Sequence, residues 1–113
     1  NLRAPSVTFW SAWVNDILCG CGALKELDRL TGEVKSMRTR SAFLRRGVGQ
    51  AILDEIVRTG RQRGYSRLLL ETGTGQAFDP AHAFYRRNGF EWSGPFGEYT
   101  ATEFNVFMAK VLV

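Results

Sequence analysis

Residues 33–50 read EVKSMRTRSAFLRRGVGQ, and this stretch decides the fold. Its first part, residues 33–40, has the composition of a strand. Gly47 and Gly49 then open a segment whose apolar residues recur at helical spacing. The backbone N–H groups at such a helix start can bind an anion, and Arg45 and Arg46 add positive charge. The alternative is that the two glycines only allow a tight turn between strand and helix.

The chain before this stretch is expected to complete a three-stranded antiparallel meander. Large β-forming residues and two groups of turn-forming residues indicate it. The predicted strands are residues 6–14, 17–26 and 33–40, and the predicted turns are residues 15–16 and 28–32.

The chain after this stretch predicts two helices and further strands. A helix is expected over 47–62, stopping at Gly64, and is followed by a buried strand over 68–72 that is parallel to its predecessor. A second helix is expected over 81–88, with Asp79 as N-cap, Pro80 at its start and Gly89 closing it. A last strand is expected over 105–113. The order β-β-β-α-β-α-β-β predicts one α/β domain with a mixed sheet, spanning residues 1–113.

Composition excludes several classes of protein. The 113 residues carry a net charge of +4 and are 44% apolar, which excludes disordered and collagen-like chains. No apolar run reaches the roughly 20 residues of a membrane helix, and residues 1–6 do not resemble a signal peptide, so a cytoplasmic location is expected. Two cysteines and one histidine are too few for a four-ligand zinc site or a disulfide framework, and we expect no metal. Cys19 and Cys21 are expected to be buried small side chains, and His82 an exposed one.

Two motifs carry a resemblance to a known family. Residues 33–50 resemble motif A of the GNAT family of N-acetyltransferases, in which a strand and a short connection lead to Arg/Gln-x-x-Gly-x-Gly/Ala at a helix start. Residues 81–90, AHAFYRRNGF, resemble the family segment A-x-x-F-Y-x-x-x-G-F. Leu44 departs from the family's Arg/Gln, and residues 71–73 lack its Asn. The family's usual N-terminal strand and helices are also absent from this chain.

The resemblance implies acetyl-CoA as co-substrate and an amine of a small molecule or protein as acceptor. The main chain of residues 37–39 is expected to bond the pantetheine arm, residues 45–50 the pyrophosphate, and Arg86 with Arg87 the 3′-phosphate. The cofactor-binding residues are thus Met37, Arg38, Thr39, Arg45, Arg46, Gly47, Val48, Gly49, Gln50 and Arg86. For Arg86 and Arg87 the alternative is a solvated helix face.

Acetyl transfer needs a base and an acid. An amine of pKa about 10.4 must lose a proton to become nucleophilic, and a thiolate of pKa near 8.5 benefits from gaining one. By resemblance, Glu33 is the base and Tyr85 the acid. Strand alternation would place residues 33, 37 and 39 on one face and so in one cleft. The alternatives are an exposed Glu33 paired with Lys25 or Lys35, Glu71 or Glu26 as base, and Tyr85 as a core residue.

The leading hypothesis is therefore an acetyl-CoA-dependent N-acetyltransferase. The alternatives are a non-catalytic acyl-CoA-binding or dimerisation module and a small basic nucleic-acid binder. The sequence has no recognisable nucleic-acid-binding motif, so neither nucleic acid nor a membrane is expected as a partner. Sheet edges left uncovered at residues 7–14 and 106–113 predict a homodimer.

Overall fold

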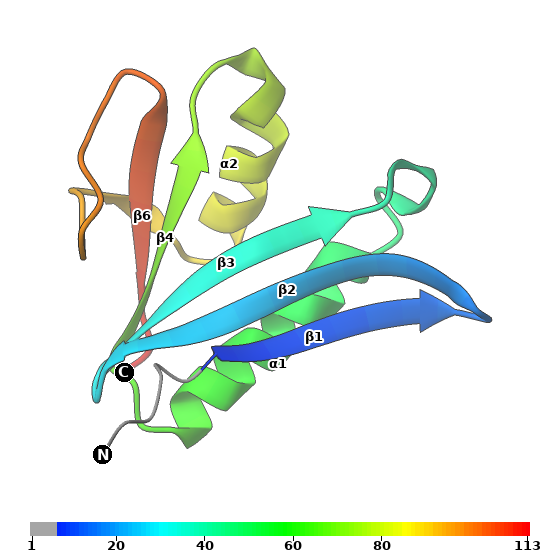
Figure 1. The fold of residues 1–113 in the computed structure, drawn as a ribbon, viewed down its shortest axis with the longest axis horizontal. Coiled ribbons are helices and arrows are strands. Elements are labelled where there is room, and N and C mark those ends of the chain that lie inside the picture. The colour runs from blue at the N-terminus through cyan, green and yellow to red at the C-terminus, as the bar shows by residue number, and fades with distance from the viewer. Residues whose placement is uncertain (1–6) are drawn as a thin grey trace.

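Six strands form one sheet in the order β1-β2-β3-β4-β6-β5 in a computed structural model that describes residues 7–113 (Figure 1). The strands are β1 (Val7–Val14), β2 (Ile17–Asp28), β3 (Thr31–Thr39), β4 (Arg67–Gly73), β5 (Glu91–Ser93) and β6 (Asn105–Val111). The helices are α1 (Val48–Gln62) and α2 (Asp79–Arg87), with short 3-10 turns η1 (Ser41–Phe43) and η2 (Gln76–Phe78). The predicted order of strands and helices is confirmed.

The parallel contact between β3 and β4 is short. They pair only at Thr31–Arg67, Gly32–Leu68 and Glu33–Leu69. Beyond these pairs, β3 stays with β2 and β4 stays with β6, so the two strands diverge (Figure 1). The sheet therefore opens in its middle.

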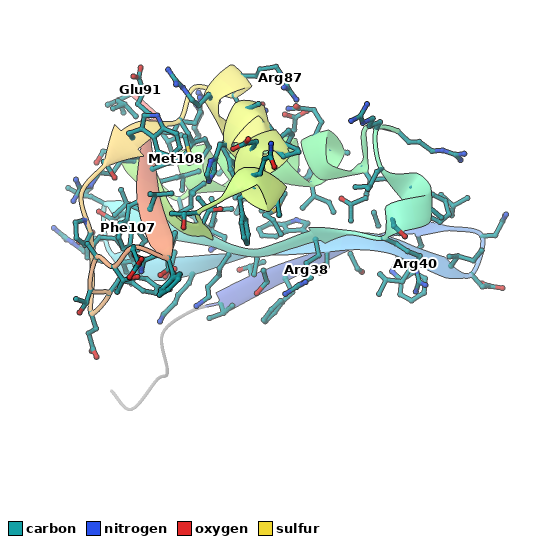
Figure 2. All side chains as sticks on the ribbon, turned by 90° about the horizontal axis from the view of Figure 1, so that it is seen from above. Arg38, Arg40, Arg87, Glu91, Phe107 and Met108 are labelled. Atoms are coloured by element: carbon teal, nitrogen blue, oxygen red, sulfur yellow. The ribbon has the colours of Figure 1, made fainter. Side chains whose placement is uncertain are left out.

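Both helices cover the same face of the sheet, as Figure 2 shows. Ile56 of α1 and Tyr85 of α2 belong to one buried apolar cluster with Leu24 and Leu70 of the sheet. On the opposite face, the segment between β5 and β6 packs its aromatic rings against β6, with Tyr99 6.0 Å from Phe107 between ring centroids. Side chains of β3 and β4 therefore point either toward the helices or toward this aromatic segment.

A bulge at Ser36 changes which side chains of β3 share a face. Ser36 has a φ of 60°, and the pairing of β3 with β2 shifts at this point. Val34 is buried in the core on the helix side, and Met37, three residues later, packs against the same core. Glu33 instead contacts Tyr99 on the other side. The prediction that residues 33 and 37 share a face was wrong, because the bulge adds one residue to the alternation.

The start of α2 also differs from the prediction. The N-cap is Phe78, without a side-chain cap bond, and Asp79 is already helical. A carboxylate in the first helical turn is still favourable, because the helix dipole is positive there. Gly64 and Gly89 have φ values of 82° and 89°, as expected for residues that terminate helices.

The two outer strands define where the sheet ends. β1 is one edge, whereas β6 lies between β4 and β5. The expectation of an uncovered edge at residues 106–113 was therefore wrong for residues 107–109, which pair with β5, whereas Val111 and Val113 are exposed. None of the helices within residues 7–113 has the length and apolar character needed to cross a membrane.

Candidate active site

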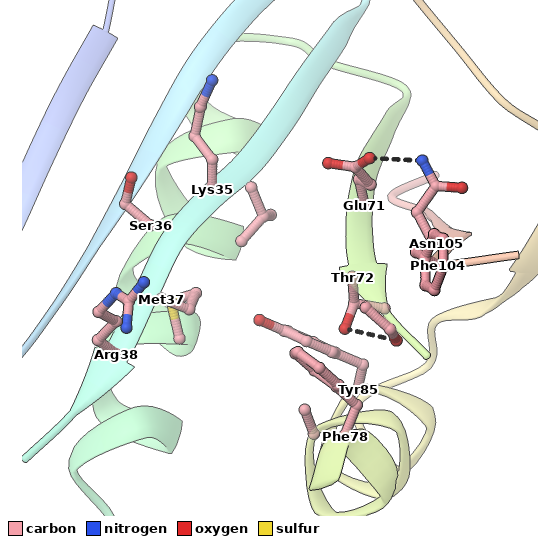
Figure 3. Close-up of a pocket in the computed structure, with 13 residues that line it drawn as sticks. Lys35, Ser36, Met37, Arg38, Glu71, Thr72, Phe78, Tyr85, Phe104 and Asn105 are labelled. Carbon is pink, nitrogen blue, oxygen red and sulfur yellow. Dashed lines mark hydrogen bonds between the residues drawn. The ribbon is translucent and has the colours of Figure 1, made fainter. Parts of the chain in front are cut away.

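A cavity of about 490 Å³ lies in the opening between β3 and β4 (Figure 3). One wall is formed by residues 34–38 of β3, and the other by residues 71–73 of β4 with residues 104–105 beside them. Phe78, Ala81 and Tyr85 complete the lining from η2 and α2. The cavity brings together Met37, Arg38 and Tyr85 from the residues predicted by sequence.

Tyr85 presents its hydroxyl to this cavity. Only 9% of Tyr85 is exposed, and its ring makes an edge contact with Phe90 at 5.6 Å between centroids. Figure 3 shows the hydroxyl pointing into the gap between β3 and β4. Burial raises the pKa of Tyr85 to about 12. The phenol therefore keeps its proton at neutral pH and can donate it.

Glu33 does not line the cavity. Only 3% of Glu33 is exposed, and its Oε2 accepts a hydrogen bond of 2.6 Å from the Tyr99 hydroxyl. Burial, this hydrogen bond and the negative charges of Glu33 and Glu71 together raise the pKa of Tyr99. The alternative of a solvated Glu33 paired with Lys25 or Lys35 was wrong, because the carboxylate is buried and tyrosine-bound. Sequence reasoning missed Tyr99, which no motif marks.

Glu71 is the carboxylate in the cavity wall. Its Oε2 accepts a hydrogen bond of 2.8 Å from Nδ2 of Asn105. Glu26, the other rival base, is outside the cavity lining and accepts a hydrogen bond of 2.7 Å from the Tyr65 hydroxyl. Of the three carboxylates considered from the sequence, Glu71 is therefore the one that lines the cavity.

The turn before α1 has the geometry of an anion site. Gly47 is the N-cap with a φ of 82°, and neither a side-chain cap bond nor an acidic residue occupies the first turn of α1. A Cβ atom at Gly47 would meet nothing within 4 Å, so the approach to the main chain is open. The N–H groups at the start of α1, from Val48 to Gln50, can thus bind a phosphate. Arg45 is exposed, and the Arg46 guanidinium lies 5.7 Å from the Phe43 ring centroid.

Gln50 and Asn88 tie the start of α1 to the end of α2. Gln50 Nε2 donates to Asn88 Oδ1 at 2.7 Å, and Asn88 Nδ2 donates back to Gln50 Oε1 at 3.1 Å. Lys110 Nζ adds a hydrogen bond of 2.8 Å to the Asn88 carbonyl. This contact links the turn before α1 to the helix that carries Tyr85, and no local pattern in the sequence signals it.

Arg86, His82, Cys19 and Cys21, which were also singled out from the sequence, do not line the cavity. The Arg86 guanidinium lies 6.0 Å from the Trp92 ring centroid. His82 is half-buried and contacts the Gly73 carbonyl at 2.9 Å, so its predicted exposure was wrong. Cys19 is fully buried and Cys21 half-buried. Within residues 7–113, no group of three or more His, Cys, Asp or Glu side chains could hold a metal ion.

Comparison with known proteins gives independent evidence on the family and the fold. The model of the acetyltransferase (GNAT) family matches residues 1–90. The uncharacterized N-acetyltransferase YsnE of Bacillus subtilis is 50% identical over 99% of this chain and 74% of its own length. The crystal structure of a GNAT-family acetyltransferase from Staphylococcus aureus aligns with a TM-score of 0.83 and 25% identity, over 96% of this chain and 70% of that one. A GNAT-family acetyltransferase from Elizabethkingia anophelis, solved with acetyl-CoA bound, shares the fold with a TM-score of 0.75 and 19% identity, over 92% and 75% of the two chains.

Proposed function

The chain belongs to the acetyltransferase (GNAT) family, and on this premise we propose that it transfers the acetyl group of acetyl-CoA to a primary amine. The observation that carries the proposal is the cavity between β3 and β4, into which the buried Tyr85 directs its hydroxyl. An opening between diverging strands can receive an extended ligand along its main chain. The acceptor amine belongs to a small molecule or a protein.

Three segments of the chain fit the co-substrate. The main chain of residues 37–39 borders the opening after β3 and β4 have separated, so it can pair with the pantetheine arm as with an added strand. The free N–H groups from Arg45 to Gln50 take the pyrophosphate. Arg86 is exposed on α2 and takes the 3′-phosphate. When bound, acetyl-CoA supplies a thioester carbonyl that an amine can attack.

Tyr85 acts as the general acid. The new C–N bond forms as the C–S bond breaks, and the departing sulfur receives the Tyr85 proton. A phenol with a pKa of about 12 is fully protonated at neutral pH and so is available at each turnover. The thiol, with a pKa near 8.5, remains protonated afterwards. The acylated nitrogen must lose one proton to become a neutral amide, and this proton returns to Tyr85 through water.

Glu33 is the proposed base and receives the amine proton through Tyr99. Tyr99 does not line the cavity, so water carries the amine proton to the Tyr99 oxygen while Tyr99 passes its own proton to Glu33, to which it is hydrogen-bonded at 2.6 Å. Glu71 is a second candidate, favoured by its place in the cavity wall. Either carboxylate would leave the amine neutral and nucleophilic.

Two measurements test the function. Acetyl-CoA should raise the melting temperature, because it binds only the folded chain. Release of free thiol should then require an amine from a panel of polyamines, aminoglycosides, amino acids and lysine peptides.

Tyr85→Phe should lower kcat by about 100-fold and leave acetyl-CoA binding intact. Acetyl-CoA binding without transfer to any acceptor would instead favour the non-catalytic acyl-CoA-binding module.

The proposal includes a cytoplasmic location and a homodimer. The dimer is motivated by apolar side chains on the edge strand β1, where Phe9 is 71% and Trp13 58% exposed. Exposed apolar side chains on an unpaired edge strand favour burial against a partner. Sedimentation at tens of micromolar chain should give the mass of two chains, and a monomer mass would refute the dimer.

A further inference from the structure

The two walls of the cavity carry opposite charges at matching positions. Glu33 and Leu69 form the last pair between β3 and β4. Lys35 and Glu71 lie two residues further along each strand, so both side chains are on the face of Glu33 and Leu69. Both line the cavity, and Figure 3 shows them on the two strands that border the gap. The cavity is therefore lined by a lysine on its β3 wall and by a glutamate on its β4 wall.

These two charges do not neutralise each other. The only salt bridge among residues 7–113 joins Arg58 and Glu55, so Lys35 and Glu71 are more than 4.0 Å apart. Glu71 is hydrogen-bonded by the Asn105 amide, which orients the carboxylate without cancelling its charge. Lys35 is half-buried, and Arg38 adds a second cation to the same wall.

We infer that the acceptor is a zwitterion, an amino acid whose carboxylate binds the β3 wall while its amine faces the β4 wall. This inference rests on the proposed function. The ammonium group would lie beside Glu71, and the carboxylate beside Lys35 and Arg38, which makes both interactions charge-assisted. A polyamine would bring positive charge against Lys35 and Arg38, so it is a poor acceptor. Lys35 and Arg38 are thus specificity-determining residues, and neither takes part in proton transfer.

The test compares each protein amino acid with its α-carboxamide, which keeps the amine and removes the negative charge. For the best amino acid, kcat/KM should exceed that of the amide by at least tenfold. Lys35→Met should reduce this ratio to less than threefold, mainly by raising KM. Lys25→Met is the matched control, because Lys25 is a half-buried lysine of β2 outside the cavity lining, and it should leave the ratio unchanged. Equal rates for acid and amide, or faster acetylation of a polyamine, would overturn the inference.

A binding measurement tests the same preference without turnover. With coenzyme A present, an N-acetyl amino acid should raise the melting temperature more than its N-acetyl amide, and Lys35→Met should abolish the difference. Equal shifts, or no shift with either compound, overturn the inference. Acetyl-CoA binding and acetylation of a lysine peptide would still support the proposed function in that case, so the two failures are distinguishable.

Discussion

The Tyr99 hydroxyl donates a hydrogen bond of 2.6 Å to the buried carboxylate of Glu33 across a sequence separation of 66 residues. This hydrogen bond joins the segment before β6 to β3 at Glu33, the last residue of β3 that pairs with β4. A carboxylate that is only 3% exposed depends strongly on such a donor, because an unsatisfied buried charge is costly.

Tyr99→Phe removes the hydroxyl group that donates this hydrogen bond and keeps the aromatic ring. We expect the free energy of unfolding to fall by about 1–3 kcal/mol, because Glu33 is left without its hydrogen bond. Urea denaturation followed by fluorescence measures the change. An unchanged midpoint would mean that water satisfies Glu33 equally well.

Glu33→Gln and Glu71→Gln identify the base. Replacing the true base should lower kcat by about 100-fold or more and remove the acidic limb of its pH profile. Replacing the other carboxylate should retain that limb. If Glu71→Gln alone abolishes the limb, proton transfer runs directly to the cavity wall, and the route through Tyr99 is wrong.

Gly47→Ala tests the anion-binding turn. A φ of 82° costs a side chain about 1 kcal/mol, so the turn should relax and the Kd for acetyl-CoA should rise. Gly94→Ala is the control, because a Cβ there meets nothing within 4 Å and Gly94 lies outside the site. Isothermal titration with acetyl-CoA measures both variants, and equal affinities would remove Gly47 from the phosphate site.

Tyr85 should make stability depend on alkaline pH. Its pKa rises from 10.0 to about 12 on folding, so the unfolded chain loses this proton first. The resulting stabilisation is fully present below pH 10 and is lost as pH rises toward 12, a change of about 3 kcal/mol. Urea unfolding between pH 8 and 11 should show a steeper loss above pH 10 for the wild type than for Tyr85→Phe. Parallel curves would contradict the burial of the phenol.

Gln50→Ala and Asn88→Ala should not be additive. Each removes both hydrogen bonds of the amide pair, so the double variant should lose less stability than the sum of the single ones, by about 1 kcal/mol. A double-mutant cycle from chemical denaturation measures this coupling. Additive losses would show that the pair contributes nothing to the link between α1 and α2.

Sequence predicted the order of the strands and helices because periodicity, glycines and turn residues are local signals. The bulge at Ser36 was missed because serine does not mark a positive φ. The apolar spacing of Val34 and Met37, three residues apart in a strand, was the available clue. Tyr99, and the contact of Gln50 with Asn88, depend on packing between distant segments. The cavity residues Met37, Arg38 and Tyr85 were found because motifs marked them.

The short pairing between β3 and β4 has a consequence for dynamics. Beyond the three residue pairs, the edges of β3 and β4 that face each other have no strand partner, so their main-chain N–H and C=O groups are open to water. Amide protons there should exchange with deuterium quickly, although they belong to the middle of a sheet. A ligand bound between β3 and β4 would slow this exchange. Protection of the amides of residues 37–39 would therefore show that the ligand is bound, without any measurement of acetylation.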